Sequence, residues 1–173
     1  MVTLAEALKG CIKYGDFTLA SGKKSSYYVD IKKASTDPLI LKLMARSIKE
    51  TLVSRSISAD YIGCVALGGV PVGVAVSLET GLPLVIIRKE TKEYGTKDLI
   101  VGEIERGKSV ILVEDVTTTG SSVMKAIKIL RDEKLVVRHV MTVVDREEGA
   151  SDNLKGADVS FIPLFRISDI LEK

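Results

Sequence analysis

Two neighbouring acids, Glu114 and Asp115, stand between a run of apolar residues and a turn rich in hydroxyl groups. The apolar run, Val110–Val113, is rich in β-branched residues, which predicts a strand buried on both faces of a parallel sheet. Open α/β sheets bind ligands at the carboxyl ends of such strands. Carboxylates at that place are suited to the hydroxyls of a sugar or to a hydrated magnesium ion.

The turn after the acids is suited to a phosphate. Apolar residues follow it at helical spacing, so it leads into the N-terminus of a helix, where free N–H groups and the helix dipole favour an anion. The alternative is that Ser121 or Ser122 only caps this helix and that the acids are a solvated strand end. A Walker A loop is excluded, because no Gly-Lys-Ser/Thr sequence follows Gly120.

Residues 17–32 contain two β-prone runs around Ser21–Lys24, which predicts a hairpin with a basic tip. Tyr27 and Tyr28 place two large aromatic rings beside that tip. A plain surface hairpin is the alternative interpretation.

Residues 88–98 form a charged, aperiodic segment with four cations, Arg88, Lys89, Lys92 and Lys97. Such a segment suits a multiply charged anion, although an ordinary exposed loop has the same composition. Farther along, Arg146 follows a predicted strand beside the central one. The planar guanidinium group of Arg146 can donate two parallel hydrogen bonds to a carboxylate or an imide edge. The alternative is a surface salt bridge with a nearby glutamate.

Strands and helices alternate along the chain, which predicts an α/β fold with a mostly parallel sheet flanked by helices, in one domain of residues 1–173. Thr3 and Glu6 form a capping box for a first helix that Gly15 would end. The expected helices are 3–13, one opened by Asp37-Pro38, 73–79, one ending near Lys134, and 167–171. The expected strands are 61–67, 84–87, 99–104, 110–113, 136–144 and 159–163.

Residues 61–78 contain no charged side chain, a length at the lower limit for a membrane span. We reject a span because Gly68-Gly69-Val70-Pro71 would break a helix there. The net charge of +2 argues against nucleic-acid and acidic-membrane partners. Cys11 and Cys64 are too few for a disulfide framework or a zinc site, and with no cleavable leader we expect a cytoplasmic location.

Glu114–Ser122 closely resembles the phosphoribosyl-diphosphate (PRPP) signature of type I phosphoribosyltransferases, and residues 17–32 resemble the amino-terminal signature of the orotate phosphoribosyltransferases. The resemblance implies transfer of the phosphoribosyl group of PRPP to orotate. Residues 1–35 and the C-terminal end would form a hood over the base. The alternatives are a purine or uracil phosphoribosyltransferase and a PRPP-sensing regulator.

The resemblance also implies a role for each matching residue. Lys92, Glu114 and Asp115 would be catalytic, and orotate would meet Tyr27, Tyr28, Thr118 and Arg146. PRPP would meet Arg88, Lys89, Lys92, Glu114, Asp115, Val116, Thr117, Thr118, Thr119, Gly120, Ser121 and Ser122. Mg²⁺ would be bound mainly through PRPP and water, and a homodimer would share the loop around Lys92 between subunits.

The chain departs from the family pattern at three places. Ala20 stands where a ligand-contacting lysine is frequent, Pro71 and Val72 replace a tyrosine-lysine pair, and Tyr94 replaces a histidine. The family also has a cis peptide in the loop that holds Pro71, and the Val70–Pro71 bond could supply it, because an X–Pro bond costs far less in the cis form than other peptide bonds.

Overall fold

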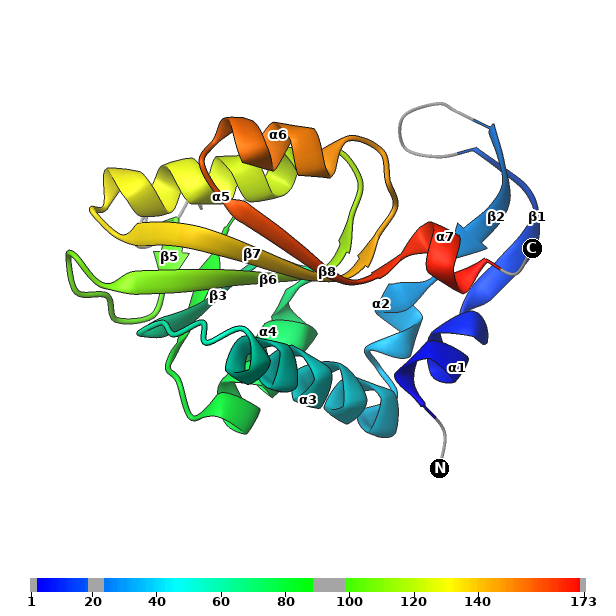
Figure 1. Ribbon diagram of the computed structural model, residues 1–173, viewed down its shortest axis with the longest axis horizontal. Helices are drawn as coiled ribbons and strands as arrows, with labels where there is room; N and C mark the ends of the chain where they lie inside the picture. Colours follow the sequence, from blue (N-terminus) through cyan, green and yellow to red (C-terminus); the bar gives the residue numbers. More distant parts are fainter. Residues whose placement is uncertain (1–2, 19–23, 89–98, 172–173) are drawn as a thin grey trace, which may run out of the picture.

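The computed structural model describes residues 3–18, 24–88 and 99–171. Its elements follow the expected alternation of helices and strands along the chain (Figure 1). The helices are α1 (Leu4–Lys9), α2 (Ile31–Ala34), α3 (Pro38–Ser54), α4 (Val70–Thr80), α5 (Ser121–Asp132), α6 (Ala150–Gly156) and α7 (Ile167–Ile170). The strands are β1 (Ile12–Thr18), β2 (Lys24–Val29), β3 (Tyr61–Val65), β4 (Leu84–Ile87), β5 (Ile100–Val101), β6 (Ser109–Thr117), β7 (Val136–Asp145) and β8 (Ser160–Arg166).

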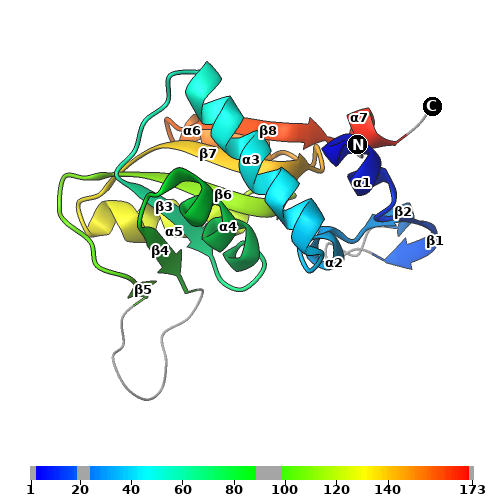
Figure 2. The same ribbon diagram turned by 90° about the horizontal axis from the view of Figure 1, so that it is seen from below.

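The central sheet has the strand order β5-β4-β3-β6-β7-β8, and all its pairs are parallel except β4–β5. Helices α5 and α6 cover one face, and α3 and α4 cover the other (Figures 1 and 2). The predicted α/β class with a mostly parallel sheet is confirmed. Among the described residues, no helix has the length and apolar character needed to cross a membrane.

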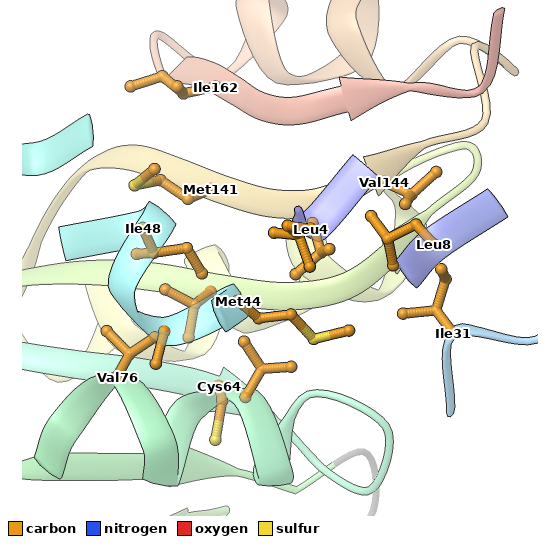
Figure 3. Close-up of a cluster of buried hydrophobic side chains, with 14 of the residues drawn as sticks. Leu4, Leu8, Ile31, Met44, Ile48, Cys64, Val76, Met141, Val144 and Ile162 are labelled. Atoms are coloured by element: carbon orange, nitrogen blue, oxygen red, sulfur yellow. The ribbon is translucent and has the colours of Figure 1, made fainter. Parts of the chain in front are cut away.

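The hairpin β1–β2 and helices α1, α2 and α7 gather beyond one end of the sheet (Figure 1). A hydrophobic core joins this group to the α3 face of the sheet, since Leu4 and Leu8 of α1 belong to the same buried cluster as Met44 and Val144 (Figure 3). The amino-terminal segment is therefore packed into the main core.

Two predicted helix boundaries are wrong, namely the end of the first helix and the start of the helix in the uncharged stretch 61–78. Helix α1 ends at Lys9 rather than Lys13, because Gly10 caps it and Ile12 already pairs with Val29 in the hairpin. Helix α4 begins at Val70 rather than Gly73, with Pro71 in its first turn, where a missing N–H costs nothing. The cis peptide lies at Ala66–Leu67 and not at Val70–Pro71.

Other differences concern short elements and strand ends. Strand β3 stops at Val65 instead of Leu67, and the expected strand 99–104 is reduced to β5. Strand β8 runs past Pro163 to Arg166, which its place at the sheet edge permits. Helices α2 and α6 were not predicted, because each is too short to show a helical period.

Candidate active site

Both acids lie within the last part of β6, and not after its end as the sequence suggested. The strand continues to Thr117 because its pairing with β7 extends that far. On the other side, its pairing with β3 stops at Val113. Beyond Val113 this edge of β6 is open, and Glu114 and Asp115 border the cavity that forms there.

The sheet topology explains why a cavity forms between β3 and β6. The chain leaves β3 into α4 on one face of the sheet and leaves β6 into α5 on the opposite face (Figures 1 and 2). Parallel sheets bind ligands where neighbouring connections diverge in this way. The acid pair therefore stands at a switch point of the topology.

The turn between β6 and α5 has the properties of a phosphate site. Gly120 has a φ of 77°, which favours glycine, and it is the N-cap of α5 without a side-chain capping hydrogen bond. The interpretation of Ser121 or Ser122 as the cap is therefore wrong. The first amides of this 12-residue helix face the turn, and Thr118 and Thr119 are exposed beside them.

Oδ2 of Asp115 and Oγ1 of Thr117 are buried polar atoms that lack a hydrogen-bond partner within the described part of the chain. Asp115 is 4% exposed and Thr117 is 3% exposed. A buried polar atom without a partner costs about 1–3 kcal/mol. Because both residues line the cavity, a bound ligand with hydroxyl or N–H donors would satisfy these atoms.

Arg146 follows β7 directly, and its main-chain N–H donates to the carbonyl oxygen of Thr117 at 2.9 Å. Its side chain is 9% exposed, and Nε lies 3.1 Å from Oε1 of Glu148. The alternative of a salt bridge with a nearby glutamate is therefore partly right. The ion pair is present, but both of its members line the cavity instead of the outer surface.

A cavity of about 650 Å³ brings most of the predicted residues together. The predicted residues in its wall are Tyr28, Glu114, Asp115, Val116, Thr117, Thr118, Thr119, Gly120, Ser121, Ser122 and Arg146. Tyr27 stands behind this wall, with its ring centroid 6.0 Å from Cζ of Arg146. Arg88 follows β4 and is not among the residues that line the cavity, and its main-chain N–H donates to the carbonyl oxygen of Leu99. Lys89, Lys92, Lys97, Ala20 and Tyr94 lie outside the described residues.

Some residues of the site were not singled out by the sequence. Asp30 and Lys32 line the cavity from the start of α2, and Gly68 lines it from the turn after β3. The side-chain amide of Asn153 on α6 donates to the carbonyl oxygen of Thr119 at 2.8 Å. It so supports the turn between β6 and α5, residues 118–120, which is called the phosphate turn below. Asp30 and Lys32 belong to the predicted hairpin stretch and Gly68 to the helix-breaking Gly68-Gly69-Val70-Pro71 sequence, whereas no local pattern marks Asn153.

Burial and hydrogen bonds shift the pKa of several groups near the cavity. Burial, with a smaller contribution from the Glu114 carboxylate, raises the pKa of the Cys64 thiol to about 12, so this thiol is not a nucleophile at neutral pH. Burial also raises the pKa of Asp145, next to Arg146. The hydrogen bond from Lys13 lowers the pKa of Asp30, which keeps a negative charge at the edge of the cavity.

Comparison with known proteins agrees with this geometry. A family model described as "Phosphoribosyl transferase domain" matches residues 33–168. The chain is 53% identical over 171 residues to the orotate phosphoribosyltransferase of Methanosarcina acetivorans, covering 98% of this chain and 90% of that protein. The crystal structure of orotate phosphoribosyltransferase from Aeropyrum pernix superposes with a TM-score of 0.88 at 32% identity, over 98% of this chain and 96% of that chain.

A third match is the structure of the Mycobacterium tuberculosis orotate phosphoribosyltransferase in complex with PRPP, with a TM-score of 0.81 at 29% identity, over 96% of each chain. The fold, the acid pair and the phosphate turn define a phosphoribosyltransferase. Within that class, the chain belongs to the orotate phosphoribosyltransferases.

Proposed function

We propose that this protein transfers the 5-phosphoribosyl group of PRPP to orotate, giving orotidine 5′-phosphate and pyrophosphate for pyrimidine biosynthesis. The observation that carries the proposal is that one cavity holds both halves of a fitting site. The acid pair and the phosphate turn form one wall, and Arg146 and Tyr28 form another. Relatives about half identical to this chain are named for the same reaction.

The ribose half of the substrate fits the β6 edge. Glu114 and Asp115 would accept hydrogen bonds from the ribose hydroxyls, while the turn from Val116 to Ser122 and the N-terminus of α5 would bind the 5′-phosphate. Breaking the bond at C1 develops positive charge on the ribose ring. Two carboxylates held beside that ring favour the charge electrostatically.

The base half fits the opposite wall. Arg146 would bind the carboxylate or imide edge of orotate through its planar fork, and Thr118 and Tyr28 would contact the ring. Tyr27 contributes by holding Arg146 from behind. Orotate is already an anion, so the reaction needs orientation of the nucleophile more than a strong base.

The leaving pyrophosphate needs positive charge. Within the described ranges, no group of three or more His, Cys, Asp or Glu side chains could hold a metal ion. The acid pair alone therefore fits Mg²⁺ that is bound chiefly by PRPP oxygens and water, as this ion prefers. When bound, Mg²⁺ supplies charge neutralisation on the pyrophosphate. Lys92 would assist, with Arg88 and Lys89, from the segment that connects β4 to β5.

We also propose a homodimer. Helix α4 exposes Val74 and Leu78, four residues apart on one face, and Leu67 precedes it; their exposed fractions are 40%, 80% and 82%. An apolar face of this kind fits a second copy of itself across a two-fold axis. The segment with Lys92 begins at Arg88, directly after β4, and would serve the partner's cavity. The hairpin, α1, α2 and α7 would form the hood over the base.

Turnover with different bases tests the proposal. Orotate consumption, followed spectrophotometrically with PRPP and Mg²⁺, should exceed turnover of adenine, guanine, hypoxanthine and uracil, and it should stop when the metal is chelated. Preference for another base would contradict the assignment. Binding of PRPP without turnover of any base would favour a PRPP-sensing regulator instead.

A further inference from the structure

Gly68 and Gly69 form the turn between β3 and α4, directly opposite the acid pair. Neither is among the glycines with positive φ, and Gly69 has ordinary helical values of −72° and −14°. Residues with side chains adopt such conformations freely. Backbone conformation therefore does not explain why glycine stands at these positions.

Space explains the two glycines in different ways. A Cβ atom on Gly68 would lie 3.0 Å from Oδ2, 3.2 Å from Oδ1 and 3.4 Å from Cγ of Asp115. A Cβ atom on Gly69 would lie 3.1 Å from Oε2 of Glu114, but also 3.2 Å from the main-chain oxygens of Val113 and Val65. A side chain at 69 would thus push on the sheet itself, whereas the three atoms nearest to a Cβ atom at 68 all belong to the carboxylate of Asp115.

The Asp115 carboxylate depends on packing for its position. Its residue is 4% exposed, and Oδ2, the oxygen nearest to Gly68, has no hydrogen-bond partner among residues 3–18, 24–88 and 99–171. Gly68 and Asp115 both line the cavity. The Asp115 carboxylate therefore stands beside position 68, in the space that a side chain there would need.

We propose that Gly68 is a positioning residue, whose missing side chain allows the main chain to hold the Asp115 carboxylate in the orientation that the ribose of PRPP requires. This inference rests on the proposed function, because it assumes that Asp115 binds the ribose. A methyl group at position 68 would force the carboxylate to move by a few tenths of an ångström.

The test compares Gly68→Ala with wild type and with Gly156→Ala, a control because a Cβ atom at Gly156 meets nothing within 4 Å. A shift of this size should raise the KM for PRPP on the order of tenfold and leave the KM for orotate within about twofold. G156A should match wild type in both constants. G68A should also have the unfolding temperature of the wild type. G69A should have a lower unfolding temperature, because its side chain strains the sheet.

Ligand binding separates this role from a direct contact between the turn and pyrophosphate. Measured by calorimetry, G68A should weaken the binding of orotidine 5′-phosphate, which carries the ribose. The affinity for inorganic pyrophosphate should stay unchanged. In an Asp115→Ala background, adding G68A should have no further effect, because the carboxylate is gone. An equal loss of affinity for both ligands would overturn the proposal. So would an effect of G68A that persists when it is combined with D115A.

Two further outcomes are also decisive. If wild type fails to use orotate, the proposed function fails, and that result is seen before any variant is made. If wild type is active and G68A behaves like G156A, only the role of Gly68 fails. Should G68A not fold, folding of the G68A/D115A double variant would support the contact, and misfolding of both would contradict it.

Discussion

The guanidinium carbon of Arg146 lies 6.0 Å from the ring centroid of Tyr27, so the end of β7 meets the amino-terminal hairpin at the cavity. This distance allows a cation–π interaction. Nε of Arg146 also lies 3.1 Å from Glu148, although without the geometry of a hydrogen bond. The arginine is therefore fixed between sheet and hairpin while its hydrogen-bonding capacity is not exhausted.

We predict that Arg146→Ala raises the KM for orotate far more than the KM for PRPP. A lost hydrogen-bonded contact between charged groups costs about 1.5–3 kcal/mol, or roughly 10- to 150-fold in affinity. Steady-state kinetics with each substrate varied in turn gives the two constants. Arg138→Ala is the matched control, since Arg138 is exposed on β7, the strand that Arg146 follows, and does not line the cavity. Equal effects on both substrates would remove Arg146 from the base side.

We predict that Asp115→Asn lowers kcat strongly, on the order of 100-fold, because a charge positioned for the transition state is lost. The fold should remain, since Asp115 faces the cavity and is not packed in either hydrophobic cluster. Circular dichroism and turnover are measured together. Asp132→Asn, at the exposed end of α5, should leave both unchanged. Full activity in D115N would refute the assignment of the acid pair.

Subunit mixing tests whether the segment with Lys92 acts on the neighbouring subunit. Lys92→Ala and Asp115→Asn homodimers should each be inactive, whereas a heterodimer should regain activity. If the segment acts across the interface, one of its two sites carries both lesions and the other carries neither. Co-expression with two different tags gives the heterodimer directly, and its turnover is compared with both parents.

Purified heterodimers with no more activity than the parents would show that the segment acts within its own subunit. Leu78→Glu supplies the control, because a charge on the exposed face of α4 should prevent dimers if that face is the interface. Light scattering during gel filtration reports the oligomeric state. A dimer that persists in L78E would place the interface elsewhere.

We predict that Lys13→Met destabilises the protein near neutral pH but not in acid. Nζ of Lys13 lies 3.0 Å from Oδ2 of Asp30, and this hydrogen bond lowers the pKa of Asp30 below its ordinary value of 3.8. The stabilisation is therefore fully present above that value and is lost as pH falls through the lower, folded-state pKa. The Lys13 side chain is 54% exposed, so we expect only about 0.2–1 kcal/mol at pH 7.

Urea unfolding at several pH values gives the free-energy difference between K13M and wild type. NMR titration of the Asp30 carboxyl carbon provides an independent measurement, and its midpoint should rise in K13M. Lys128→Met on helix α5, where Lys128 is exposed, serves as the control for removal of one surface cation. A difference that does not change with pH, together with an unmoved midpoint, would show that Lys13 does not act through the Asp30 charge.

The sequence alone determined the features that depend on local pattern. The apolar run at Val110–Val113 marked the central strand, the acids and hydroxyls after it marked one wall of the cavity, and Asp37-Pro38 marked the start of α3. Each of these rests on residue types within one turn or one strand, where backbone preference and side-chain chemistry act over short distances. The hairpin and the parallel sheet followed from the same kind of pattern.

Only the tertiary structure decided which residues meet. Strand β6 extends to Thr117 because β7 pairs with it that far. Helix α1 ends early because Ile12 already pairs with Val29 in the hairpin. The space at Gly68 depends on the Asp115 carboxylate, which lies far away in the sequence. Such contacts arise from packing between distant segments, and packing leaves no periodic signal in the residues that make it.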